Sequence, residues 1–286
     1  PSAEGIKGMI QKAMGAEVAS SGEQAGTSFM SGFKGAALKI AAALGIGAAI
    51  KTGITAALSE GASLQQSLGG IETLFKDSKA QVVKYADEAY RTTGLSANAY
   101  MENVTGFSAS LLQSLGGDTA KAAEVANMAM IDMADNSNKM GTSMESIQTA
   151  YQGFAKQNYT MLDNLKLGYG GTKEEMQRLL SDAEKLTGTK YDINNLNDVY
   201  QAIHTIQDNL DITGTTAKEA STTFAGSFNS MKAAAHNLLG DLALGEDVEP
   251  ALIALADTAK TFFVDNFLPM LWNVVKGVPD ILASAF

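Results

Sequence analysis

Apolar side chains recur every three or four positions through most of residues 61–215, which places them along one face of an α-helix. Successive stripes of this kind end at a glycine or at a short polar segment. Runs that alternate in the manner of a strand are nearly absent, and no proline lies between Pro1 and Pro250. The chain is therefore predicted to be all-α, with a compact multi-helix domain at its centre. The predicted inward positions of this domain are Leu64, Leu68, Ile71, Leu74, Phe75, Val82, Val83, Ala86, Ala89, Tyr90, Tyr100, Val104, Phe107, Leu111, Leu115, Val125, Met128, Ile131, Ile147, Tyr151, Phe154, Met176, Leu179, Leu180, Ala183, Leu186, Leu196, Val199, Ile203, Ile206 and Leu210.

Short polar residues ahead of these stripes predict where the helices begin. A Ser, Thr or Asp side chain can accept a hydrogen bond from a free amide of the first turn, and a Glu three residues later can complete a capping box. Glycine after an apolar stripe predicts where a helix ends. The predicted caps are Ser96, Asp118, Thr142 with Glu145, Thr172 with Glu175, and Thr216 with Glu219, and the predicted stops are Gly94, Gly116, Gly117 and Gly188.

The first segment, residues 1–60, is predicted to form an Ala/Gly-rich apolar helix. Its uncharged run between Lys39 and Lys51 is 11 residues long, whereas a bilayer core needs about 20 apolar residues. Small residues recur four apart, a spacing that lets helix backbones approach closely. Two interpretations stay open: a packed helix that self-associates, and a membrane-active segment that is sheltered until it is needed. The candidate contacts in this segment are Ala41, Gly45, Gly47 and Gly53.

The third segment, residues 216–286, is predicted to form amphipathic to apolar helices. Residues 250–286 are strongly apolar and are interrupted by Pro269 and Pro279. We expect this stretch to pack on the central domain, on a second copy, on another protein or on a membrane surface. The candidate membrane or oligomer contacts are Phe262, Phe263, Phe267 and Trp272.

Charge and composition narrow the possible functions. The net charge of −10 argues against a non-specific nucleic-acid binder, which needs a basic surface. Without Cys there is no disulfide, no thiol chemistry and no cysteine-ligated metal, and two His cannot make a histidine-rich metal site. We therefore predict a protein that is not an enzyme and that has no catalytic residues, no metal and no cofactor.

The residues that could carry chemistry have simpler explanations. His204 and His236 each lie on an apolar helical stripe and are expected to be ordinary helix residues. Glu174 and Glu175 open a helix, where acidic side chains complement the helix dipole. The Gly-rich run from Gly168 to Lys173 lacks the spacing of a phosphate-binding loop and follows no strand. These residues therefore do not predict an active site.

One stretch is distinctive enough to resemble a known family. From Asn158 to Leu180 the chain reads NYTMLDNLKLGYGGTKEEMQRLL, followed by SDAEKLTG, and this resembles the tape-measure domain of tail tape measure proteins of tailed bacteriophages and prophages, especially those of Gram-positive hosts. The runs QQSLGGIETLF at 65–75 and SFNSMKAAAHNLL at 227–239 resemble the earlier and later helices of that family. The positions that carry the family-like motif are Asn158, Tyr159, Leu162, Gly168, Gly171, Thr172, Glu175 and Leu179.

The resemblance implies a structural virion protein that lies in the lumen of the tail tube. Proteins of that family associate with themselves, as a homotrimer or another small homo-oligomer, and act in tail assembly and in setting tail length. The implied partners are the tail tube protein, the tail assembly chaperones, the tail tip or baseplate hub proteins and, after release ahead of the DNA, the host membrane. No sequence-specific nucleic-acid contact is implied.

Family members are usually much longer, so the resemblance also implies that this chain is an N-terminal part. Even one continuous helix of 286 residues would span only about 430 Å, so we expect this part to serve one end of the tail. Two competing classes stay open. One is a free membrane-permeabilising helical effector, and the other is a helical scaffold or adaptor; a cell-wall hydrolase is a more distant alternative.

Overall fold

The computed structural model describes residues 50–270 and 272, with side chains from residue 59 onward, and this part of the chain is all-α without any strand. The prediction of an all-α fold is confirmed. In chain order the helices are α3 (Ile50–Phe75), the short η1 (Lys76–Ser78), α4 (Lys79–Thr92), α5 (Ala97–Ser114), α6 (Thr119–Met140), α7 (Met144–Phe154), the short η2 (Leu162–Leu165), α8 (Lys173–Thr187), α9 (Leu196–Asn209), α10 (Thr215–Thr222), α11 (Phe224–Leu244), α12 (Glu249–Lys260) and the π-helix η3 (Thr261–Phe267).

One large core joins α3 to α9, and its centre is aromatic. Tyr100, Tyr151 and Tyr200 are fully buried. A buried phenol needs a hydrogen-bond partner, and accordingly Tyr100 donates to Asn127 Oδ1 at 2.9 Å and Tyr200 donates to the carbonyl of Tyr151 at 3.0 Å. The predicted inward positions are buried or partly buried, except that Leu186 and Leu210 are about half exposed. Both lie at the end of a helix.

Three of the five predicted caps form, and tertiary contacts replace the other two. Ser96, Asp118 and Thr172 each accept the expected amide hydrogen bond. The cap predicted at Thr142 is wrong, because Ser143 caps α7 and the Thr142 hydroxyl donates to the carbonyl of Asn164 at 2.8 Å.

The cap predicted at Thr216 is also wrong. Helix α10 begins after Gly214, which has a φ of 82°. Thr216 is already inside this helix, and a carboxylate on another helix, Asp135, accepts the hydrogen bond from its backbone amide. A tertiary contact has therefore replaced the local cap.

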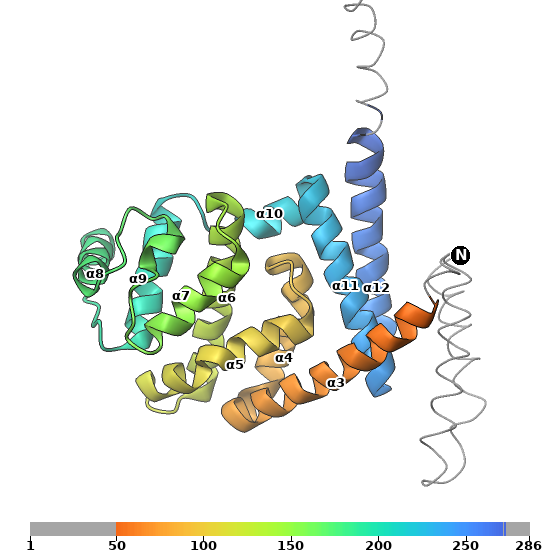
Figure 1. The fold of residues 1–286 in the computed structure, drawn as a ribbon, viewed down its shortest axis with the longest axis horizontal. Coiled ribbons are helices and arrows are strands. Elements are labelled where there is room, and N and C mark those ends of the chain that lie inside the picture. The colour runs from red at the N-terminus through yellow and green to blue at the C-terminus, as the bar shows by residue number, and fades with distance from the viewer. Residues whose placement is uncertain (1–49, 271, 273–286) are drawn as a thin grey trace, which may run out of the picture.

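Helix α11 crosses α3 at a point where glycines on both helices face the partner. A Cβ at Gly61 would collide with Cβ of Ala243, and a Cβ at Gly240 would lie 2.8 Å from Cδ2 of Leu64. Small residues let these backbones approach closely. Figure 1 shows α11 and α12 side by side, with α3 running across α11, and α8 at the opposite end of the view. The predicted segment boundaries at 60/61 and 215/216 fall inside α3 and α10.

The described part of the apolar C-terminal segment packs on α11. Leu238 and Leu242 of α11 form a small second core with Val248 and Ala251 at the start of α12. Pro250 lies in the first turn of α12, where its missing amide costs nothing. Among the helices of the described residues, none combines the length and the apolar character needed to cross a bilayer.

Candidate functional site

The segment that carries the family-like motif is the loop of residues 155–172, here called the motif loop, which connects α7 to α8. Leu162 and Leu165, on the single turn η2, are buried in the main core and so anchor the loop to it. The Asn158 side chain accepts hydrogen bonds from the amide and hydroxyl of Thr160, at 3.1 and 2.8 Å. The Tyr159 hydroxyl donates to the carbonyl of Ile193 at 2.9 Å, which ties the loop to the segment before α9.

Helix α6 is also hydrogen-bonded to the motif loop. Asn136, which is fully buried, donates from Nδ2 to the carbonyl of Leu165 at 3.0 Å. Near the end of α6, the Lys166 ammonium donates to the carbonyl of Met140 at 2.9 Å. The Leu165 carbonyl of the loop and the Met140 carbonyl at the end of α6 thus each accept from a side chain across the contact between helix and loop.

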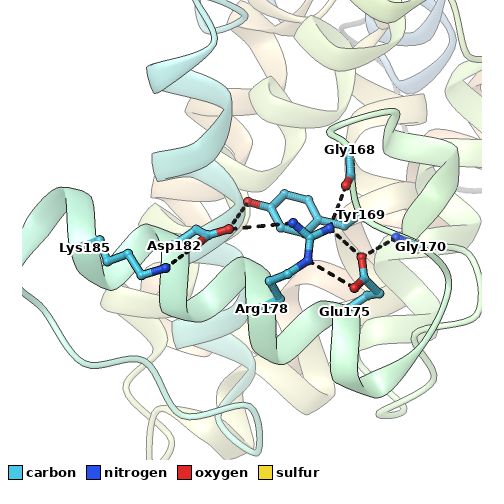
Figure 2. Close-up of polar contacts among 7 residues, drawn as sticks. All are labelled: Gly168, Tyr169, Gly170, Glu175, Arg178, Asp182 and Lys185. Carbon is cyan, nitrogen blue, oxygen red and sulfur yellow. Dashed lines mark hydrogen bonds and ion pairs between the residues drawn. The ribbon is translucent and has the colours of Figure 1, made fainter.

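Figure 2 shows how the upper part of the loop is closed onto α8 by a polar cluster, here called the α8 clamp. Its centre is Arg178, which donates to both Glu175 oxygens, from Nε at 3.1 Å and from Nη2 at 2.6 Å. The same Nη2 donates to the Gly168 carbonyl at 2.7 Å, and Glu175 Oε2 accepts from the Gly170 amide at 3.0 Å. Both side chains of the ion pair therefore also bind the loop backbone.

Tyr169 is enclosed by the same side chains. The Arg178 guanidinium lies over its ring at 4.3 Å from the centroid, a cation–π contact. Its hydroxyl donates to Asp182 at 3.0 Å, and Asp182 in turn pairs with Lys185 at 2.7 Å. The clamp is thus built from Glu175, Arg178, Asp182 and Lys185, spaced three or four positions apart along α8.

Contacts within the clamp shift the pKa values of Glu175 and Tyr169 away from their ordinary values. The hydrogen bonds from Arg178 and from the Gly170 amide lower the pKa of Glu175 to about 2. Burial and the hydrogen bond to Asp182 raise the pKa of Tyr169 to about 12. Neither group exchanges a proton near neutral pH, where a general acid or base needs its pKa. The clamp can fix the shape of the loop, and it presents that shape on the surface.

The eight motif positions named from the sequence all lie in this unit. Asn158, Tyr159, Leu162, Gly168, Gly171 and Thr172 are in the loop, Thr172 caps α8, and Glu175 and Leu179 are on α8. Three residues that hold the loop, Tyr169, Arg178 and Asp182, were not singled out by the sequence. The signal for Arg178 and Asp182 was the spacing of opposite charges on one predicted helix, which indicates local ion pairs but not which loop they bind.

Three of the four candidate contacts of the third segment, Phe262, Phe263 and Phe267, gather in an aromatic face. Phe262 is buried, and its ring lies 4.8–5.9 Å, between centroids, from four other phenylalanines. Phe224, Phe228 and Phe263 are 41%, 44% and 49% exposed, and Phe267 is partly buried. The aromatic face consists of Phe224, Phe228, Phe262, Phe263 and Phe267. Val264, Leu268, Met270 and Trp272 are further exposed apolar residues of the same C-terminal stretch.

The candidates of the first segment lie mostly beyond the described part of the chain. Ala41, Gly45 and Gly47 are outside the described residues, and Gly53 lies in α3. Both histidines face carboxylates: His204 Nδ1 lies 2.8 Å from Asp132, and His236 Nδ1 lies 3.3 Å from Glu60. Within the described residues, no group of three or more His, Asp or Glu side chains is arranged to hold a metal ion.

Comparison with known proteins does not identify a family for this chain. No family model, no curated protein and no solved structure matches the chain. The all-α architecture follows from the structure itself, and the function has to be argued from the motif loop, the α8 clamp and the aromatic face.

Proposed function

We propose that this chain is part of a tail tape measure protein that lies in the tail tube lumen of a tailed phage and acts in tail assembly and length determination. After release it would assist DNA passage across the host envelope. The proposed partners are further copies of itself, the tail tube protein, the tail assembly chaperones and the proteins of the tail tip. It has no catalytic role in this proposal.

The observation that carries the proposal is that the residues of the family-like motif form one structural unit. Gly168, Gly171 and Thr172 shape the loop, and Glu175 binds its backbone through the Gly170 amide. A motif whose residues all maintain one loop supports a role in presenting a surface of fixed shape. The pKa directions of Glu175 and Tyr169 support the same role, because both groups keep one protonation state near neutral pH.

Quantitative mass spectrometry of purified tail particles, before and after triggered DNA ejection, tests the proposal. We expect peptides from residues 61–215 at a few copies per tail and their loss on ejection. The tail tube protein is the internal control, since its copy number per tail should not change. Absence of these peptides from intact tails would overturn the proposal.

The aromatic face favours one alternative, a free membrane-permeabilising helical protein. Exposed aromatic side chains are suited to the interface of a bilayer, and Phe263 and Trp272 are 49% and 60% exposed. The alternative predicts leakage of dye from liposomes by the purified chain alone, without a tail particle. Leakage that is lost in Phe263→Ser but kept in Ile253→Ser, another exposed apolar position, would support the alternative; no leakage would reject it.

A further inference from the structure

Three neighbouring side chains on one face of α6 form hydrogen bonds to three different parts of the fold. Asp132, Asp135 and Asn136 are buried to 1% exposure or less. Asp135 accepts the backbone amides of Gly214 and Thr216, at 2.6 and 2.7 Å, and so holds the start of α10. Asn136 holds the motif loop, and Asp132 holds α9 through His204. The spacing of three and four residues places all of them on one side of the helix.

Asp132 is the member of this row whose charge is least compensated. One carboxylate oxygen lies 2.8 Å from His204 Nδ1, and the other, Oδ2, is buried without a hydrogen-bond donor among the described residues. The titratable groups that face it are Asp135 on its own helix, Tyr151 on α7, and His204 and Asp208 on α9. His204 is the one group of this set that can carry positive charge, and it faces three carboxylates.

We propose that the Asp132–His204 pair is a proton-binding site that controls how firmly α9 is held on α6. With one proton the pair has no net charge. Without it a buried carboxylate faces Asp135 and Asp208 with no cation beside it, which is costly in an apolar interior. The His204 side chain is 34% exposed, so a proton can reach the pair from solvent without unfolding of the core. This inference does not depend on the proposed function.

The direction of the pH effect follows from the two partners together. Burial raises the pKa of Asp132 from 3.8 to about 6, against the opposing effect of His204. The hydrogen bond to Asp132 raises the pKa of His204 above 6.5. Protonated His204 stabilises the fold below pH 6.5, and this stabilisation is lost as the pH rises through the folded-state pKa of the histidine. Ionisation of Asp132 destabilises the fold as the pH rises from 3.8 through about 6. Both effects have the same sign, so the contact weakens as the pair loses protons with rising pH.

Thermal unfolding of the full chain between about pH 5 and pH 9 tests the site. The key variant is Asp132→Asn, which keeps an acceptor for His204 and removes the charge. We expect the wild-type midpoint at about pH 8.5 to lie roughly 3 °C or more below that at about pH 5.5. In Asp132→Asn this difference should shrink by about 2 °C, through a higher midpoint at the alkaline end. The share that comes from Asp241, whose pKa is also raised to about 6, should remain. Asp77→Asn is the matched control, since it removes an exposed carboxylate and changes the net charge equally.

A second measurement on the wild-type chain does not depend on any variant folding. The chain has two histidines, so NMR of histidine labelled at Cε1 gives two titrations, and His204→Gln assigns them. We expect the His204 midpoint above 6.5 in the wild type and a fall of about one pH unit in Asp132→Asn. Amide hydrogen exchange of α9, corrected for intrinsic rates, should show less protection at about pH 8.5 than at about pH 5.5. A His204 midpoint at or below 6.5 in the wild type, or equal α9 protection at both pH values, would overturn the proposal.

Discussion

Gly171 lies against the carbonyl of Thr160, so close that a Cβ on the glycine would collide with the carbonyl oxygen. The contact is between backbone and backbone, and neither side can rotate away. It brings the end of the motif loop next to its beginning, one residue before Thr172 caps α8. The glycine is therefore required by the path of the loop.

Gly171→Ala should destabilise the protein by about 1–3 kcal/mol, the cost of overpacking a site that cannot relax. Gly170→Ala is the matched control. A Cβ there would meet Glu175 Cγ at 3.5 Å, an ordinary contact, so we expect a change within about 0.5 kcal/mol. Urea unfolding measures both variants, and equal effects at the two positions would contradict the close approach at Gly171.

Arg178→Ala should open the motif loop while leaving the rest of the fold intact. The change removes the donors to Glu175 and to the Gly168 carbonyl, together with the ring contact on Tyr169. Arg178→Lys should restore little, because an ammonium cannot make the paired hydrogen bonds of a guanidinium. Hydrogen exchange should become faster in residues 155–172 and stay unchanged in α4. Lys185→Ala, which removes an outer cation of the same cluster, is the control with no expected effect on the loop.

Asp241→Asn should stabilise the protein at neutral pH. Burial, together with Asp87, Glu246 and Asp247, raises the pKa of Asp241 to about 6. Because this pKa lies above the ordinary 3.8, the ionised carboxylate costs stability above pH 6, and the cost disappears as pH falls towards 3.8. We expect a gain of about 1 kcal/mol at about pH 8 and almost none at about pH 4, measured by urea unfolding. A loss of stability at the higher pH would show that the charge is compensated in the fold.

Three glycines of helices α3 and α11 should respond differently to alanine. Gly69→Ala has open space and should gain up to about 1 kcal/mol from helix propensity. Gly240→Ala should be close to neutral, because the end of Leu64 can rotate away. Gly61→Ala should lose about 1–3 kcal/mol, because Cβ of Ala243 has no such freedom. Thermal unfolding gives the order, and any other order would contradict the geometry of this crossing.

Two neighbouring phenylalanines should separate packing from surface function. Phe262→Ala removes the buried centre of the aromatic face and should cost about 3 kcal/mol. Phe263→Ser removes a ring that is 49% exposed, so its effect on stability should stay within about 1 kcal/mol. If the aromatic face is a contact surface, Phe263→Ser should reduce the number of copies of the chain that are incorporated per tail particle. Unchanged incorporation would exclude a role for this ring.

Much of the local structure was predictable because it depends on neighbours in sequence. The stripes of α5 and α9, the caps at Ser96, Asp118 and Thr172, and the stop at Gly188 all involve contacts within one or two turns. The caps at Thr142 and Thr216 failed because distant groups, Asn164 and Asp135, bind these residues instead. Local chemistry proposed a cap in each case, and a tertiary hydrogen bond replaced it.

The candidate site shows the same division. The sequence identified the motif residues from Asn158 to Leu179 and the apolar character of residues 262–272. It did not indicate that Arg178 would bind the Gly168 carbonyl, or that α11 would cross α3 through Gly61 and Gly240. Such contacts depend on where helices far apart in sequence meet.

The sequence by itself therefore determined that the chain is helical, where most of its helices begin and end, and which faces are apolar, since these follow from periodicity and nearest-neighbour hydrogen bonds. Tertiary structure alone decided which buried polar groups become partners. The pairing of Asp132 with His204 joins residues 72 positions apart, and its charge balance also depends on Asp135 and Asp208. The electrostatic energy of a group depends on every charge near it in space, which one-dimensional order does not record.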